Sequence, residues 1–231
     1  MTSTQIDQRV SLAVSTVIFA LRAHPRTGAE TLWLPLVRRI REPYEGQWAL
    51  PGGPLEMDED LTGSARRTLE RTTGLTPNYI EQLYSFGEVD RSPPRSGAAH
   101  DPDRVVSIVY WALVRPDEAA RAVDGENVEW FVADEVPDLA FDHNRIVEYA
   151  LGRLRAKITY SPIAYAFLNP EFTLAELREV HEAVLRKPLD PANFRRQVLA
   201  SNAIEPTGTC LTGTSHRPPA LYRAVSTEER S

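Results

Sequence analysis

Apolar residues follow two different spacings along this chain, and the change comes near residue 160. Before it, runs rich in β-branched and apolar residues are typical of buried strands. They predict strands at 9–22, 31–39, 104–114 and 128–133. A further short extended segment ends at "ALPGG" (49–53), where the glycines indicate a turn.

Helical spacing is present in the same part of the chain at two places. Leu61, Ala65 and Leu69 recur every four residues and predict a helix over about 59–73. Acidic residues at its start suit the helix dipole, and Gly74 is a typical stop signal. A second amphipathic helix is predicted at 142–158, and the Pro-rich and Gly-containing segment 91–103 predicts a flexible loop.

Beyond residue 160 the helical pattern dominates. Thr173 and Glu176 form a capping box that opens one helix. Asp190 as N-cap and Pro191 at the first helical position open a second helix after a tight turn. The Gly- and Thr-rich stretch 207–223 indicates a β-hairpin. This order predicts a helix-turn-helix followed by a wing.

Composition narrows the class of protein without identifying it. The chain of 231 residues has a net charge of −6 and one cysteine, which excludes an internal disulfide. The N-terminus lacks a signal-peptide pattern and no apolar run is long enough to span a bilayer, so we expect a cytoplasmic protein without membrane contact. Residues 155–231 hold 10 Lys and Arg against 8 Asp and Glu, whereas the remainder holds 16 against 24. This division suggests either two functions or an uneven solvated surface.

The stretch "GPLEMDEDLTGSARRTLERTTGL" after "WALPG" resembles the signature of the Nudix hydrolases. That signature reads G-x5-E-x7-R-E-U-x-E-E-x-G-U, where U is a bulky aliphatic residue. Six of its positions are occupied as the family has them, namely Gly53, Glu59, Arg67, Leu69, Gly74 and Leu75. The resemblance implies the α/β/α sandwich of the Nudix fold.

The positions that differ from the signature are the ones that bind metal in the family. The three helix acids that hold divalent metal in the family are Thr68, Arg71 and Thr72 here. An arginine on this face repels Mg²⁺, and hard cations need a set of oxygen ligands. We therefore expect no metal site, no catalytic residue and lost hydrolysis. The alternative is that metal ligands have moved, for example to Asp101, Asp103 or Glu126.

A pocket that has lost its catalyst can still bind a nucleotide. The candidate ligand-binding residues are Arg39, Trp48, Gly53 and Arg104. Arginine forks suit phosphate, and Arg39 matches an arginine common at this point in the family. Trp48 either packs on an adenine or ribose face or belongs to the core. Gly53 begins the signature, and Arg104 opens a strand beside the predicted loop.

The pieces "FTLAELREVHEAVLRKPLDPANFRR" and "HRPPALYR" resemble the C-terminal winged helix-turn-helix of the Nudix-related transcriptional regulators, NrtR. Candidate DNA-binding residues are Asn193, Arg195, Arg196 and Gln197 in the second helix, with Arg217 and Arg223 in the wing. Recognition helices present their N-terminal residues to bases, and amide and guanidinium groups read base edges. Phe194 is expected in the core, and an ordinary solvated face is the alternative for the arginines.

The resemblance covers nearly the whole chain and implies an α+β protein in two domains. We expect a Nudix-like ligand-sensing domain at 1–158, a winged helix-turn-helix at 159–224 and a flexible tail at 225–231. The family implies a homodimeric repressor of NAD biosynthesis or salvage genes on a pseudo-palindromic operator. ADP-ribose would be the effector that releases DNA, with no cofactor required.

Two other functions stay open from the sequence. One is a Nudix pyrophosphohydrolase acting on ADP-ribose or a related nucleoside diphosphate, with displaced metal ligands. The other is a nucleotide-sensing module that docks a protein partner through its C-terminal helices.

Overall fold

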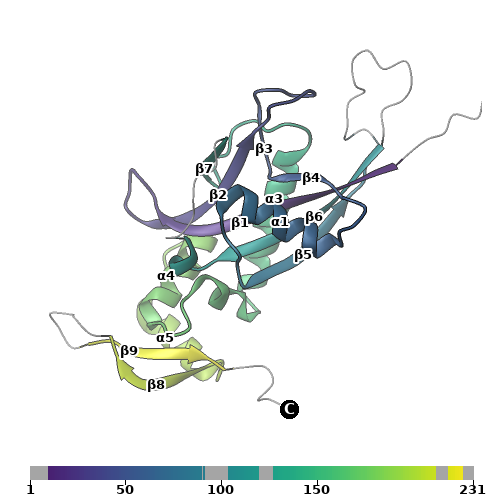
Figure 1. Ribbon diagram of the computed structural model, residues 1–231. Helices are drawn as coiled ribbons and strands as arrows, with labels where there is room; N and C mark the ends of the chain where they lie inside the picture. The colour runs from purple at the N-terminus through teal and green to yellow at the C-terminus, as the bar shows by residue number, and fades with distance from the viewer. Residues whose placement is uncertain (1–9, 90, 92–103, 120–126, 212–217, 226–231) are drawn as a thin grey trace, which may run out of the picture.

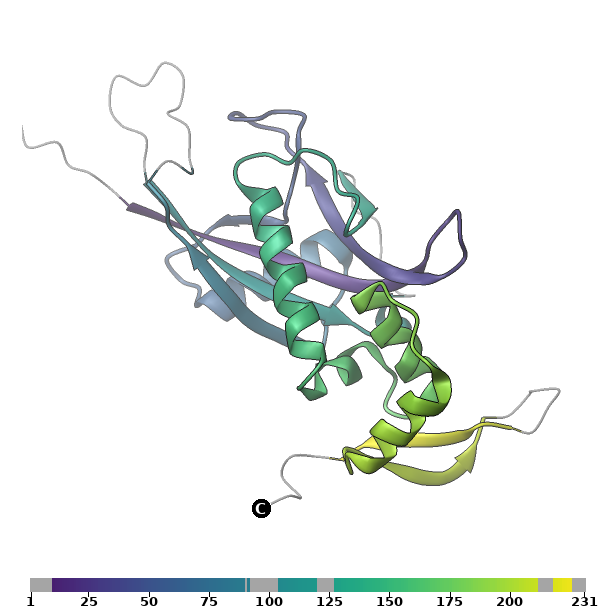
Figure 2. The same cartoon turned by 180° about the vertical axis from the view of Figure 1, so that it is seen from behind.

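The computed structural model describes residues 10–89, 91, 104–119, 127–211 and 218–225. A twisted sheet lies at its centre, with one long helix on each face (Figures 1 and 2). A smaller unit of helices and a two-stranded sheet follows at the C-terminal end of the chain, beside the end of α3. The structure is therefore an α/β/α sandwich joined to a winged helical unit, as the sequence predicts.

The central sheet has seven strands. They are β1 (Val10–Ala23), β2 (Glu30–Arg38), β3 (Trp48–Ala49), β4 (Gly52–Pro54), β5 (Tyr79–Phe86), β6 (Arg104–Val114) and β7 (Val128–Val132). Their order is β3-β2-β1-β6-β5, with β4 paired to β1 and β7 to β2. β1 and β6 run parallel from Val10 opposite Arg104 to Ala20 opposite Val114, and the other pairs in this sheet are antiparallel.

The two middle strands are buried on both faces, which explains their unbroken apolar sequence. Val17 and Phe19 of β1 belong to the core cluster that includes α3 (His143–Ile158). Ile18 and Ala20 belong to the cluster that includes Leu69 of α1 (Leu61–Thr73). Because side chains alternate along a strand, each helix covers one of the two residue sets.

The caps of α1 account for its limits. The Asp60 carboxylate accepts a hydrogen bond from the Gly63 N–H at 2.6 Å, so the helix begins at Leu61 and not at residue 59. Gly74 adopts the left-handed conformation, with φ of 69°, and its N–H donates to the Glu70 carbonyl at 2.7 Å. A one-turn helix, α2 (Pro116–Ala119), follows β6.

The C-terminal unit has the predicted order. It contains the 3₁₀ helix η1 (Pro162–Phe167), α4 (Leu174–Leu185), α5 (Pro191–Ala200), β8 (Ile204–Cys210) and β9 (Ala220–Ala224). The capping box forms, since Thr173 accepts from the Glu176 N–H at 3.1 Å and Glu176 accepts from the Thr173 N–H at 2.6 Å. β8 and β9 form the predicted antiparallel wing, and Phe172 bridges to Tyr222.

The structure has a short strand, β4, where the glycines of 49–53 predicted a turn, and three further elements were missing from the sequence interpretation. β5 is an edge strand whose residues are mostly exposed and whose register shifts between Gln82 and Tyr84, so it lacks a clear apolar alternation. η1 and α2 are too short for a periodic signal. Of the predicted loop 91–103 only Arg91 is described, and residues 226–231 of the predicted tail also lie outside the described residues.

A continuous core joins the two units. One apolar cluster includes Trp111 of the sheet, Leu154 of α3, Phe167 of η1, Val184 of α4 and Phe194 of α5. The predicted domain limit after residue 158 coincides with the end of α3, but the packing does not stop there. The limit itself therefore stays a prediction.

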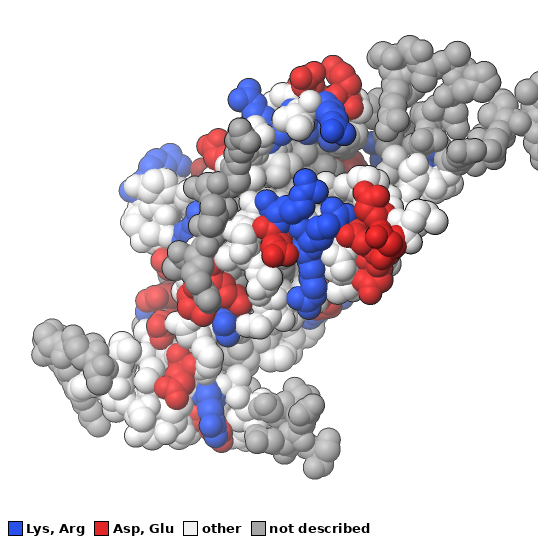
Figure 3. Space-filling view, viewed as in Figure 1, with Lys and Arg blue, Asp and Glu red and all other residues white. Residues whose placement is uncertain are grey.

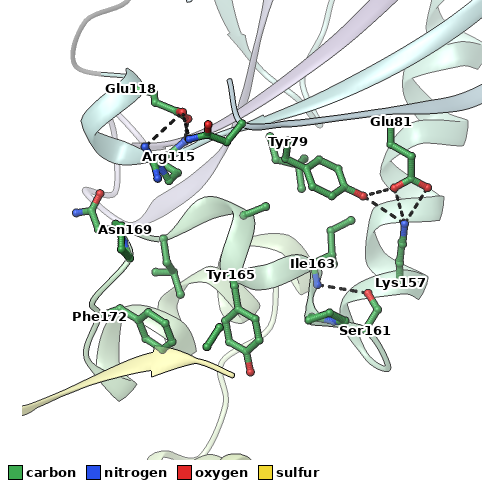
Figure 4. A pocket seen from close by; sticks show the side chains of 17 residues that line it. Tyr79, Glu81, Arg115, Glu118, Lys157, Ser161, Ile163, Tyr165, Asn169 and Phe172 are labelled. Atoms are coloured by element: carbon green, nitrogen blue, oxygen red, sulfur yellow. Dashed lines mark hydrogen bonds and ion pairs between the residues drawn. The ribbon is translucent and has the colours of Figure 1, made fainter. Parts of the chain in front are cut away.

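Ion pairs surround this junction. Arg155 donates to both Asp134 oxygens at 2.7 and 2.8 Å, and its Nε donates to the Val184 carbonyl at 3.0 Å. A cavity of about 630 Å³ lies between β5, η1 and Phe172 (Figure 4). Lys157 pairs with Glu81 at one edge of that cavity. The apolar cluster and the Arg155–Val184 hydrogen bond thus hold the winged unit to the Nudix part of the chain, whereas the Lys157–Glu81 pair joins α3 to β5.

Replacing Thr173 with alanine tests the capping box. Thr173 is buried, and its hydroxyl caps α4. We expect Thr173→Ala to lower the free energy of unfolding by about 1–2 kcal/mol, measured by urea denaturation of the full chain. Thr76→Ala, at an exposed position outside any helix, is the matched control. Equal stability of the two variants would contradict a stabilising role for the box.

Candidate ligand site and candidate nucleic-acid interface

The framework of the Nudix signature forms around α1. Arg67 binds the Glu59 carboxylate through Nε and Nη2, the second bond measuring 2.8 Å. These hydrogen bonds lower the pKa of Glu59 and fix the segment before α1 against the helix. Leu69 and Leu75 are buried on the sheet side. Position 71 is therefore held at a defined place on the helix surface.

The three signature positions that lack acids differ in exposure. Thr68 and Thr72 are 8% and 7% exposed, and the Thr72 hydroxyl donates to the Thr68 carbonyl at 2.7 Å. Arg71 is exposed, and so is Arg66 on the same helix. Basic side chains gather over α1 beside the acids of the preceding segment (Figure 3). The helix surface is thus basic where the signature is acidic.

The donor set does not fit a divalent metal. A threonine pair and an arginine occupy the signature positions, and Arg67 already engages Glu59. Within the part of the chain that the structure describes, no group of three His, Cys, Asp or Glu side chains is placed to hold a metal ion. Hard cations need several oxygen ligands. The alternative ligands Asp101, Asp103 and Glu126 lie outside the described residues.

Arg39 lies at the end of β2 and is held by the following loop. Its Nε donates to the Pro43 carbonyl at 2.8 Å, and Nη2 donates to the Arg41 carbonyl at 3.3 Å. The guanidinium stacks over the Phe141 ring at 4.6 Å. Burial lowers the pKa of Arg39. The guanidinium is positioned by loop carbonyls and an aromatic ring, with further N–H donors remaining for a ligand.

Trp48 and Gly53 lie on the short segment 48–53. Its first residue contacts the loop before α3, and Gly53 pairs with β1. Trp48 is half-buried and packs edge-on against Phe131 at 5.2 Å, while its carbonyl accepts from the Ala140 N–H at 2.8 Å. Gly53 pairs with Val14, and a side chain added there would meet no atom within 4 Å. There is open space beside the first residue of the signature. Trp48 fills part of the core and keeps one exposed portion.

Arg104 lies across β1 from this segment, opposite Val10, and its Nη2 donates to the Gly87 carbonyl at 2.9 Å. Nearby, the buried Arg91 forms two hydrogen bonds with Asp142, at 2.7 and 3.0 Å. Sequence reasoning missed this pair because no local pattern joins residues 51 positions apart. The ligand-binding roles of Arg39, Trp48, Gly53 and Arg104 stay predictions.

The second helix of the winged unit presents its predicted residues to solvent. Asn193, Arg195, Arg196 and Gln197 of α5 are all exposed. Phe194 is 8% exposed and packs against His181, with ring centroids 5.2 Å apart, so its expected place in the core is correct. Arg196 donates to the Asn193 side-chain oxygen at 2.6 Å. The polar face of α5 is therefore exposed, as the prediction of a DNA-reading helix requires.

The wing has one exposed cation among the residues that the structure describes. Arg223 of β9 is exposed and pairs with Glu205 of β8 across the hairpin, at 2.6 Å. Arg217 lies outside the described residues. An exposed arginine in a wing has the charge and reach for a phosphate contact. The DNA-binding roles in α5 and in the wing stay predictions.

The fold and these two surfaces define a class: a Nudix domain joined to a winged helix. The sequence model of the NUDIX domain matches residues 14–150, and that of the NrtR DNA-binding winged helix domain matches residues 164–224. The chain belongs to the NrtR family, which confirms the resemblance drawn from its sequence.

Known proteins are similar over most of the chain. The ADPR responsive transcriptional repressor NtrR of Acinetobacter baylyi is 33% identical over 197 residues, covering 83% of this chain and 75% of the relative. The crystal structure of Shewanella oneidensis NrtR complexed with a 27mer DNA is 34% identical, has a TM-score of 0.72 and covers 93% of each chain.

The chain is also similar, over a shorter stretch, to an enzyme. An ADP-ribose pyrophosphatase of Methanocaldococcus jannaschii is 32% identical over 113 residues, which is 49% of this chain and 62% of the relative.

Among the described residues, no helix is long and apolar enough to cross a membrane.

His143, at the start of α3, gives a prediction for pH dependence. Its Nδ1 accepts from the Leu50 N–H at 3.0 Å, and burial lowers its pKa from the ordinary 6.5 to about 4. Because the folded-state pKa is depressed, its stabilisation is complete above about pH 6.5 and is lost as the pH falls toward 4.

We expect the stability of the chain to fall between pH 6 and pH 5 by up to about 1.4 kcal/mol per unit more than that of His143→Asn. The asparagine keeps an acceptor near the Leu50 N–H but does not titrate. Urea denaturation at both pH values measures the difference. Parallel pH profiles for the two proteins would show that His143 is not the group responsible.

Proposed function

We propose that this chain is a DNA-binding repressor of NAD biosynthesis or salvage genes whose Nudix domain binds ADP-ribose as effector without hydrolysing it. The observation that carries the proposal is the pairing of two features in one chain. A Nudix framework has Thr68, Arg71 and Thr72 where metal-binding acids belong, and a winged unit exposes a polar reading helix.

The DNA half of the proposal rests on α5. Its exposed amide and guanidinium groups lie in the first two turns, the part of a reading helix that meets base edges. Arg195 and Arg196 contact guanine or phosphate, and Asn193 and Gln197 suit adenine. The similar structure of Shewanella oneidensis NrtR, which covers 93% of each chain, is a complex with a 27mer DNA. A pseudo-palindromic operator read by a homodimer follows from the way winged helices usually bind.

The effector half rests on the Nudix domain and on the relative that responds to ADPR. ADP-ribose can release DNA only by binding better to an arrangement in which the reading helices do not fit the operator. α3 offers a physical connection between the two functions. Its N-terminal end lies near Arg39, because the Arg39 guanidinium stacks over Phe141 and its charge acts on His143 in the first turn. At the other end, Arg155 in the last turn donates to the Val184 carbonyl of α4.

The length of this connection suits a direct mechanical link. α3 has 16 residues, roughly 24 Å at a rise of about 1.5 Å per residue. It packs in the same apolar cluster as α4 and α5. A shift of Arg39, Phe141 and His143 on ligand binding would move α3 and, with it, the reading helix. In a dimer, such a movement changes the spacing of two reading helices.

Fluorescence anisotropy on promoter DNA tests the proposal, at fixed salt because phosphate contacts depend steeply on it. We expect specific binding that added ADP-ribose reverses. Arg196→Ala should cost about 1–3 kcal/mol and reduce base preference, whereas Arg195→Ala should weaken binding at least through lost phosphate contact. Arg153→Ala, exposed on α3, is the control and should bind as the natural chain does. Normal DNA binding by both α5 variants would contradict a DNA-reading role of these arginines and favour the alternative, in which the C-terminal helices dock a protein partner.

A second candidate function is hydrolysis of ADP-ribose, favoured by the similarity to a pyrophosphatase over 113 residues. The signature positions oppose it, because they supply no carboxylate to hold a metal. We expect no AMP release from ADP-ribose in excess Mg²⁺ or Mn²⁺ by the full chain. Turnover at ordinary enzymatic rates, on the order of 1 s⁻¹ or faster, would establish the hydrolase and displace the proposal of a silent domain.

A further inference from the structure

Arg71 is the unexplained residue of the signature helix. Of the three guanidinium groups on α1, that of Arg67 is neutralised by Glu59. Arg66 and Arg71 are exposed, and Arg71 makes no ion pair or hydrogen bond within the described part of the chain. An exposed lysine or arginine is ordinary on a helix. The place of Arg71 in the framework is what distinguishes it.

The framework fixes that place. The Asp60 and Gly74 caps set both ends of α1, and the Glu59–Arg67 pair sets its orientation to the preceding segment. Residues three and four apart lie on one helix face, so Thr68, Arg71 and Thr72 share a face. Thr68 and Thr72 are nearly buried, so of these three side chains only that of Arg71 is exposed to solvent.

From this mismatch between framework and metal ligands, and resting on the proposed ADP-ribose binding, we infer that Arg71 binds the diphosphate of the nucleotide. It supplies from the chain itself the positive charge that a metal ion supplies in a hydrolytic site. The nucleotide site is then independent of divalent metal. A diphosphate carries negative charge on oxygens that a guanidinium fork can bind in pairs.

The same substitution accounts for binding without cleavage. A metal both holds the diphosphate and lowers the pKa of a bound water to produce a nucleophile. A guanidinium carries only donors and stays protonated, so it can hold phosphate oxygens but cannot accept a proton from water. Thr72 gives no base either, since its hydroxyl donates to the Thr68 carbonyl. One arginine thus retains the electrostatic attraction and abolishes the chemistry.

Arg66 provides a matched control. It is exposed on the same helix and has the same charge, but five residues before Arg71 it points about 140° away around the axis. Long-range attraction of an anionic nucleotide depends on both arginines. Of these two arginines, only Arg71 contacts the diphosphate directly.

Isothermal titration calorimetry of the full chain with ADP-ribose separates these effects. We expect the natural chain to bind equally well in EDTA and in Mg²⁺. Arg71→Ala should weaken binding on the order of tenfold to a hundredfold, as loss of a charge-assisted contact does. Arg66→Ala should change it less than about threefold, as a screened surface charge does. Circular dichroism and the thermal midpoint check that the exposed substitutions leave the fold intact.

The outcomes distinguish this inference from the proposed function. Absence of any ADP-ribose binding by the natural chain would overturn the proposed function and the inference with it. Binding that requires Mg²⁺ would overturn the inference alone. So would equal affinities of Arg71→Ala and the natural chain in EDTA, because ADP-ribose would then be bound without Arg71.

Discussion

The structure depends on one constraint: α3 has to bury its apolar face against the sheet while its end supports the winged unit. Leu154 and Ile158 of α3 belong to the same apolar cluster as Trp111 of the sheet and Val184 of α4. Arg155 adds a charged bond from the same turn to the Val184 carbonyl. Burial of this size costs several kcal/mol to undo. The reading helix therefore cannot be placed independently of the Nudix sheet, and a repressor controlled by a ligand needs that dependence.

The Nudix signature contains two kinds of residue, and only one kind is kept here. Gly74 ends the helix in a left-handed conformation, Leu69 and Leu75 fill the core, and Arg67 pairs with Glu59. These residues build the fold, so their loss would cost stability whatever the domain does. The three positions where the signature has acids hold Thr68, Arg71 and Thr72 here, and none of them belongs to the apolar core clusters. In the proposed sensing function, the framework keeps the nucleotide site in place without carboxylates for a metal.

Sequence alone predicted the features that depend on local chemistry. Apolar runs predicted the two middle strands, β1 and β6, which are buried on both faces. Spacing, caps and glycines predicted helices α1, α4 and α5 and the wing. The remaining features depend on residues far apart in the chain. Arg91 binds Asp142, Arg155 binds the Val184 carbonyl, and β5 is an exposed edge with a shifted register. A pattern of neighbouring residues in the sequence cannot predict these contacts, because their partners are far apart in the chain. The polar face of α5 was predictable, but the Arg196–Asn193 bond on it was not.

The central claim is that the nucleotide site and the DNA-reading helix are energetically coupled, and reciprocity tests this claim most directly. The measurement is the dissociation constant of ADP-ribose for the full chain, free and saturated with promoter DNA, at one salt concentration. Linkage requires DNA to weaken ADP-ribose binding by the same factor by which ADP-ribose weakens DNA binding, typically about 5- to 150-fold. The same ADP-ribose affinity with and without DNA would contradict the claim, because the two sites would then act independently.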